Sequence, residues 1–213
     1  MNKTLLLSTL LALAAGEAVA QGGMSDEERM QRVERLLAAT NPLEAGDSVW
    51  IEELTYIEVR DRVAGGATTA IISTGGIEEN GPYLATGKHN YIMKGVCPAL
   101  ARALGNALCA PIVGFVPEGN LDPPSGAMHF PGTFGVRTET YEMLLEDIAT
   151  SLKLDGFTDI AMIGDSGGNQ RGMKAVADRL NERWADEVVR VHFIGEFYSP
   201  GWEDTERYTE EVL

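Results

Sequence analysis

The feature that most constrains the fold of this 213-residue chain is the regular alternation of apolar, strand-like runs with amphipathic helical segments. Strands are predicted over residues 68–73, 108–115, 159–163 and 188–194. Helices are predicted over residues 90–104, 138–152 and 169–184, between the strands. Such alternation favours a parallel sheet, because each crossover helix packs back onto it. The sequence therefore predicts an α/β fold with a mostly parallel sheet and helices on both faces.

Four loops should carry the function of a chain folded in this way. Ligands of open α/β sheets bind beyond the carboxyl ends of the strands. The loops expected at that edge are residues 74–89, 116–133, 164–169 and 195–200. They hold most of the unusual residues of the chain, so we expect the site there.

The first residues resemble an export signal in their order of charge, apolar run and small residues. Lys3 precedes an apolar stretch over residues 5–15, and Ala18-Val19-Ala20 precedes Gln21. We expect cleavage near Ala20 and a periplasmic or secreted protein. No stable membrane anchor is expected, because the apolar run is shorter than the roughly 20 residues that span a bilayer.

Behind the predicted signal, residues 21–48 are expected to form a helix and a linker, and residues 49–213 an α/β domain. Capping boxes at 25–28 and 55–58 predict two early helix starts. The acidic segment 202–213 resembles the opening of a further helix, which suggests that the chain is C-terminally truncated. The net charge of −15 is spread along the chain, so nucleic acid is not an expected partner.

The chain has only two cysteines, Cys97 and Cys109. An oxidising compartment would allow them to form a disulfide. One falls in a predicted helix and the other in a predicted buried strand, and free buried thiols are the favoured reading.

The first loop combines a carboxylate and an imidazole that follow the same strand. Glu78 and His89 are eleven residues apart, and both are ligands that Zn²⁺ or Mn²⁺ accepts, with Asn80 as a weaker oxygen ligand. A catalytic zinc needs about three protein ligands, so another loop must supply at least one more. Glu118 follows an apolar run and Glu196 follows the last strand, which makes both candidates for a general base or acid.

Three motifs together resemble those of the creatininase family of metal-dependent amidohydrolases. They are Glu-x-Asn-Gly-Pro-Tyr-Leu from Glu78, Phe-Pro-Gly-Thr at 130–133 and Gly-Gly-Asn at 167–169. In most of the family the first loop reads Glu-x-His-Gly-Pro-His-Leu-Pro and ends in Thr-Asp. The third motif there reads Asn-Gly-His-Gly-Gly-Asn, with a metal-binding histidine where this chain has Ser166. The chain is thus similar to a divergent, exported member with altered metal-ligand positions.

The resemblance implies a three-layer α/β/α fold, one or two Zn²⁺ or Mn²⁺ ions and hydrolysis of a C–N amide bond, for example in a cyclic amide. It also implies a small-molecule amide substrate and a homo-oligomer. Asp165 is hypothesised to replace the lost histidine as a ligand, and Asn169 to cap the following helix. The expected substrate-binding residues are Tyr83, Lys88, His129, Ser166 and Asn169.

Two other functions stay open. Residues 164–168 match Gly-x-Ser-x-Gly, the nucleophile elbow of serine α/β-hydrolases, and they follow a strand and open a helix as that elbow requires. Its only downstream histidine, His192, falls inside a predicted buried strand, where bonding to a neighbour is the simpler interpretation. Because ligands are lost at Asn80 and Ser166, the chain is also interpretable as a non-catalytic relative that binds a small molecule.

Overall fold

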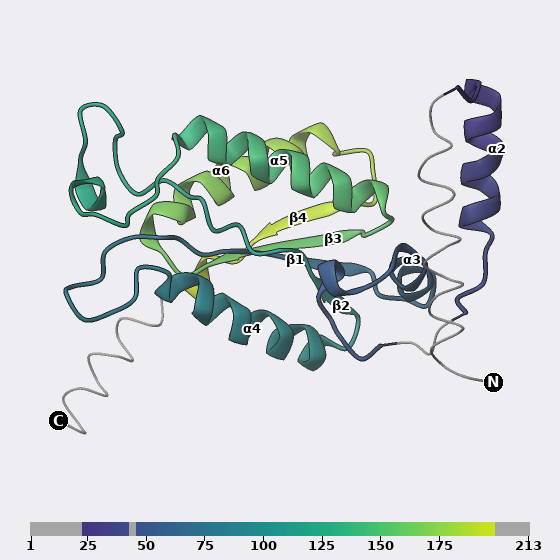
Figure 1. Ribbon diagram of the computed structural model, residues 1–213, viewed down its shortest axis with the longest axis horizontal. Coiled ribbons are helices and arrows are strands. Elements are labelled where there is room, and N and C mark those ends of the chain that lie inside the picture. The colour runs from purple at the N-terminus through teal and green to yellow at the C-terminus, as the bar shows by residue number, and fades with distance from the viewer. Residues whose placement is uncertain (1–22, 43–45, 199–213) are drawn as a thin grey trace. The chain divides into compact units, whose positions relative to one another are not determined.

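A computed structural model describes residues 23–42 and 46–198, and the chain divides into a unit of residues 1–44 and a unit of residues 45–213 (Figure 1). In the first unit, helix α2 spans Asp26–Leu37 and its predicted capping box is confirmed: Ser25 and Glu28 each accept a hydrogen bond from the other's amide. The predicted signal peptide and the acidic segment 202–213 lie outside the described residues. Within the described ranges, no helix is long and apolar enough to cross a membrane.

The second unit is built on a sheet whose described part has four strands, all parallel, in the order β2-β1-β3-β4. The strands are β1 (Thr69–Thr74), β2 (Ala107–Cys109), β3 (Asp159–Gly164) and β4 (Arg190–Phe193). The helices are α3 (Tyr56–Ala64), α4 (Lys88–Leu104), α5 (Thr138–Leu154) and α6 (Gly167–Arg183). Short 3-10 turns cover Ile51–Glu53, Gly126–His129 and Gly195–Phe197.

Helices cover both faces of the sheet, so the predicted three-layer α/β/α fold is confirmed. Figure 1 shows α5 and α6 on one side of the strands and α4 on the other. Successive side chains of a strand point to opposite faces. Ala70, Ile72 and Ile160 accordingly pack into one cluster with residues of α5 and α6, whereas Ile71 and Ile163 pack into a second cluster with residues of α4.

Some predicted element boundaries are corrected by the structure. The second strand was expected over residues 108–115, but β2 ends at Cys109. Pro111 has no amide hydrogen and cannot continue the ladder. Beyond it, the chain returns to β1 through a hydrogen bond from the Val113 amide to the Ser73 carbonyl. The starts of α4 and α6 each lie two residues before the predicted ones, so His89 belongs to the first turn of α4.

Cys97 and Cys109 form a disulfide, which corrects the prediction of free buried thiols. Cys97 lies on α4 and Cys109 ends β2. The two side chains meet in the core cluster between this helix and the sheet, and both residues are fully buried. Their pairing depends on packing between elements, which the sequence does not display.

His192 lies in β4, at the end of the described strand order, and is exposed instead of buried as predicted. Its Nε2 atom is 2.9 Å from Oδ1 of Asp159 on β3. The expectation that this histidine bonds to a neighbour is therefore confirmed. Successive side chains point to opposite faces, so Val191 is buried in the cluster with α5 and α6, whereas His192 points to the other face of β4 and is exposed there.

Candidate functional site

Two glycines fix the path of the loop that leaves β1. A Cβ atom on Gly75 would overlap the Asn90 side chain, and one on Gly76 would overlap the Glu118 carboxylate. Asn90 Oδ1 also accepts a hydrogen bond from the Gly76 amide at 3.1 Å. The exit of β1 therefore packs directly against α4 and against the segment that carries Glu118. Three parts of the chain that are distant in sequence meet at this point.

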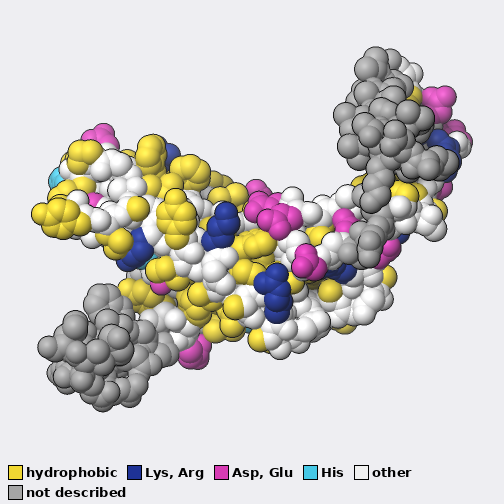
Figure 2. Space-filling view, turned by 60° about the horizontal axis from the view of Figure 1, so that its bottom comes forward, with side chains coloured by type: hydrophobic (Ala, Val, Ile, Leu, Met, Phe, Trp, Pro, Cys, Tyr) yellow, Lys and Arg dark blue, Asp and Glu magenta, His cyan; other side chains and the backbone are white. Residues whose placement is uncertain are grey.

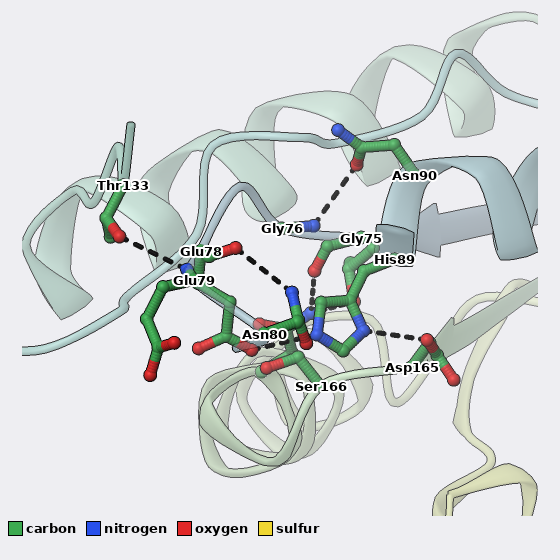
Figure 3. A network of polar contacts seen from close by, with 12 residues as sticks. Gly75, Gly76, Glu78, Glu79, Asn80, His89, Asn90, Thr133, Asp165 and Ser166 are labelled. Carbon is green, nitrogen blue, oxygen red and sulfur yellow. Dashed lines mark hydrogen bonds and ion pairs between the residues drawn. The ribbon is translucent and has the colours of Figure 1, made fainter. Parts of the chain in front are cut away.

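His89 lies between two carboxylates that come from different loops (Figure 3). Its Nε2 atom is 2.8 Å from Glu78 Oε1, and its Nδ1 atom is 2.7 Å from Asp165 Oδ2. The imidazole is buried, whereas both carboxylates are partly exposed. The structure thus brings Glu78, His89 and Asp165 together, as the loop positions predict.

Glu118 is a buried acid next to Glu78. Its Oε1 atom has no hydrogen-bond partner among the described residues. Burial raises the pKa of Glu118 to about 8, and the negative charge of Glu78 acts in the same direction. The Glu118 carboxyl group is consequently protonated at neutral pH, which makes it a proton donor beside the other acids.

The turn after β3 is tied to the exit of β1 by Asn169. This residue is fully buried, and its Nδ2 atom donates hydrogen bonds to Thr74 Oγ1 at 3.0 Å and to the Gly75 carbonyl at 2.7 Å. Ser166, not Asn169, is the N-cap residue of α6. The prediction that Asn169 caps the helix is therefore wrong, and its amide instead fixes the backbone at the exit of β1.

A cavity of about 490 Å³ opens over these groups. Part of its lining is polar and part is apolar or aromatic, as is usual for small-molecule sites. The lining residues are Glu78, Asn80, Lys88, His89, Ile92, Asp165, Ser166, Gly167, Phe197 and Tyr198. Asn80 donates a hydrogen bond from Nδ2 to the Glu78 carbonyl at 3.0 Å. Lys88 and Ser166, which the sequence predicts to be substrate-binding residues, both line the cavity.

Tyr83, His129 and Glu196 were predicted as site residues but do not line this cavity. Tyr83 is fully exposed, and the other two are exposed as well. Tyr83 and His129 belong to long loops that extend past the carboxyl edge of the sheet. Apolar side chains are prominent at this end of the molecule in Figure 2. Glu196 lies in the 3-10 turn Gly195–Phe197. The two residues that follow it, Phe197 and Tyr198, line the cavity instead.

The donor atoms suit a divalent cation, although they do not converge on one point. Among the described residues, no three His, Cys, Asp or Glu side chains are arranged to hold a metal ion as they stand. The reason lies in the ring of His89, whose two nitrogens face Glu78 and Asp165 in different directions. On the Glu78 side, however, two acids lie side by side, and Glu118 Oε1 has no hydrogen-bond partner in the described part of the chain. A cation there would reduce the repulsion between the two acids and would give Glu118 Oε1 a partner. The residues on this side of His89 therefore fit a metal ion.

The geometry around Ser166 does not support the serine-hydrolase alternative. The strand, turn and helix of an elbow are present, but Ser166 has an ordinary extended backbone with φ −119° and ψ 141° instead of the strained turn of a nucleophile elbow. Both ring nitrogens of His89 face carboxylates. His192 is bonded to Asp159 at the start of β3, about 20 Å of strand away from the turn. Neither of these histidines is therefore placed as a base for Ser166.

Sequence reasoning missed several residues that build the site. Asn90 fixes the exit of β1, whereas the sequence predicts it only as the start of a helix; its position directly after His89 is the signal that points to the site. Ile92 lies one helical turn from Lys88 and faces the same cavity. Phe197 and Tyr198 follow the last strand, as the carboxyl-edge rule would have suggested.

The fold and the cavity together define an α/β protein whose polar site lies at the carboxyl edge of a parallel sheet. A family model described as Creatininase, creatinine amidohydrolase, matches residues 52–212. The chain belongs to the creatininase family. No curated protein matches the chain.

Solved creatininase structures share the fold. A crystal structure of creatinine amidohydrolase is similar to this chain with a TM-score of 0.63 and 24% identity, covering 70% of this chain and 58% of its own. A structure described as "Creatininase Mn" is similar with a TM-score of 0.62 and 23% identity, over the same shares of 70% and 58%. A mutant creatininase described as the Zn-Zn type has a TM-score of 0.58 and 24% identity, again covering 70% of this chain and 58% of its own. The chain thus spans less than two thirds of the length of these relatives.

Proposed function

We propose that this protein is a metal-dependent amidohydrolase that cleaves a C–N amide bond of a small molecule. The observation that carries the proposal is the contact of His89 with Glu78 and Asp165, all three of which line one cavity, with the buried acid Glu118 next to Glu78. Membership of the creatininase family supports the reaction class. The solved relatives described with manganese or zinc support a divalent ion.

The residues that would hold the ion are Glu78 and His89 through Nε2, with the side-chain oxygen of Asn80 as a weaker donor. When bound, a divalent ion supplies positive charge that polarises an amide carbonyl. Glu118 would give a proton to the departing nitrogen, because it is a buried carboxyl group beside Glu78 and its burial raises its pKa.

Other lining residues would bind and orient the substrate. Lys88 and Ser166 offer hydrogen-bond donors to a carbonyl oxygen. Ile92 and Phe197 give the cavity an apolar part, against which the carbon skeleton of a small amide would exclude water. A compact cyclic amide suits a cavity of about 490 Å³.

Elemental analysis of the purified protein tests this proposal together with hydrolysis of creatinine and other small cyclic amides. We expect bound manganese or zinc, loss of activity with a chelator and recovery when the ion is restored. Glu78→Ala should lose the metal. Glu118→Gln should retain it while turnover falls about 100- to 10,000-fold, because proton transfer is lost. Bound metal without turnover on any amide would indicate a binding protein, and undiminished activity in chelator would refute the metal mechanism.

We also propose that the protein is exported. The order of charge, apolar run and small residues over 1–20 supports this, and the Cys97–Cys109 disulfide is typical of an oxidising compartment. Amino-terminal sequencing of the mature protein should find Gln21 or a close neighbour as the first residue. An uncleaved protein in the cytoplasm would contradict the proposal.

A further inference from the structure

We propose that Asp165 positions His89 and is not itself a ligand of the metal, an inference that rests on the proposed function. Asp165 Oδ2 is 2.7 Å from Nδ1 of His89, whereas Glu78 Oε1 is 2.8 Å from Nε2 on another side of the ring. Figure 3 shows the imidazole between these two carboxylates. The two nitrogens direct their donors or lone pairs apart, so an ion bound at Nε2 beside Glu78 is out of reach of Asp165.

Hydrogen-bond chemistry then fixes the state of the ring. An ionised carboxylate only accepts hydrogen bonds, so the contact with Asp165 places a proton on Nδ1. In the neutral imidazole the other nitrogen, Nε2, keeps its lone pair. The 2.8 Å contact of Nε2 with the Glu78 carboxylate needs a second proton on the ring, and a cation that binds at Nε2 would take the place of that proton while the proton on Nδ1 stays with Asp165. Asp165 thus selects the tautomer of His89 that can bind a metal on the Glu78 side.

The backbone around Asp165 is braced, so this contact is built into the fold. Gln170 on α6 donates hydrogen bonds from Nε2 to the carbonyls of Gly164 and Ser166, both at 3.0 Å. The Asp165 amide donates to the carbonyl of Thr74 at 3.3 Å. The turn is therefore anchored to α6 on one side and to β1 on the other. A carboxylate held in this way can orient the imidazole without rearrangement.

In many metal sites, a carboxylate accepts a hydrogen bond from the histidine that binds the metal, and Asp165 has the same position relative to His89. Such partners fix the ring orientation and raise the basicity of the ligand, and their loss weakens metal binding about 10- to 100-fold without removing the site. A true ligand behaves differently, because its loss removes a bond to the ion. The two roles of Asp165 can therefore be separated by experiment.

The test compares Asp165→Asn with Glu78→Gln in the full chain, using Mn²⁺ affinity and the visible spectrum of bound Co²⁺. Asp165→Asn is expected to weaken Mn²⁺ binding about 10- to 100-fold, while the number of ions bound at saturation and the Co²⁺ spectrum stay as in the wild type. Glu78→Gln should change the Co²⁺ spectrum, because an oxygen ligand is lost. Asp159→Asn is the matched control, since Asp159 also contacts a histidine, His192 on β4, but lies at the start of β3, and it should change neither property.

Nitrogen-15 NMR of labelled histidine gives a readout that needs no metal. The chain has only three histidines, which simplifies assignment. Protonated Nδ1 of His89 should be observed in the metal-free wild type and lost or averaged in Asp165→Asn. A Co²⁺ spectrum altered as in Glu78→Gln would show that Asp165 is a ligand and overturn the inference. Unchanged affinity with an unchanged His89 signal would overturn it as well. If the wild type binds no metal, the proposed function fails, and the His89 signal alone decides the role of Asp165.

Discussion

At the scale of single residues, the site depends on Gly75 and Gly76, whose surroundings leave no room for a side chain. Gly75 lies against Asn90 so closely that a Cβ atom would overlap the amide side chain. The same Asn90 oxygen accepts the hydrogen bond from the Gly76 amide. These contacts set where the loop with Glu78 leaves the sheet. The position of Glu78, a proposed metal ligand, therefore depends on Gly75, which has no side chain that could take part in the reaction.

Gly75→Ala should therefore destabilise the protein and disturb the site. Forcing one extra carbon into a filled space typically costs about 1–3 kcal/mol of the free energy of unfolding. The loss of stability is measured by urea denaturation. Gly95→Ala is the control, because a Cβ atom at Gly95 in α4 meets nothing within 4 Å. There the alanine should stabilise the helix by up to about 1 kcal/mol. Equal stabilities of the two variants would contradict this account of the loop.

At the scale of elements, helix α3 begins at a capping box that adds a pH dependence to stability. The Glu58 carboxylate accepts hydrogen bonds from the amides of Gly46 and Thr55, at 3.0 and 2.9 Å, and from the Thr55 hydroxyl at 2.8 Å. These bonds favour the ionised form and lower the pKa of Glu58 to about 2, with the Gly46 amide as the largest cause. The helix start and the chain before it are thus joined through one charged group.

The sign of the effect follows from the lowered pKa. In the unfolded chain Glu58 takes up its proton near its ordinary pKa of 4.5, whereas in the folded protein it stays ionised down to about 2. The unfolded state therefore binds more protons between these values, and stability is lost as the pH falls through that range. Glu58→Gln should show a smaller loss of stability between pH 4.5 and pH 2 in thermal unfolding. Glu52→Gln, at an exposed position just before α3, should retain the wild-type dependence.

Elements are also the scale at which the sequence was most informative. The strands follow from continuous apolar runs, because they are buried on both faces of the sheet, and the helices follow from apolar residues three or four positions apart. The predicted β1 and the capping boxes are confirmed for this reason. The predicted boundaries were wrong next to glycine and proline: α4 begins directly after Gly87, α6 begins at Gly167, and β2 ends two residues before Pro111.

The candidate site was predictable only as far as topology alone could place it. The ends of β1 and β3 had to meet at one edge, which is why Glu78, His89 and Asp165 were expected together. Which nitrogen faces which carboxylate depends on side-chain packing, and the sequence does not encode it in any local pattern. The burial of Glu118 against Gly76 and the exposure of His129 are likewise results of three-dimensional packing.

At the scale of the whole molecule, the disulfide joins one outer layer to the sheet. Cys97 belongs to α4, which begins at the site with Lys88 and His89, and Cys109 ends β2, the strand at one end of the described sheet. The bond closes a loop with a sequence separation of 12 residues. It therefore restricts the unfolded chain and ties the helix that carries His89 to the layer that carries Glu78.

Breaking this bond should lower the stability of the molecule and so loosen the site. In the loop-closure account a disulfide over a loop of this size contributes about 3 kcal/mol, and a range of about 2–4 kcal/mol is typical. Urea denaturation of the wild type with and without a thiol reductant should show a loss of this order in the free energy of unfolding. The double variant Cys97→Ala and Cys109→Ala is the control, because its stability should be low already and should not respond to reductant. A wild type that is equally stable with and without reductant would contradict a structural role for the bond. Since α4 holds His89, we also expect metal affinity to fall together with stability when the bond is reduced.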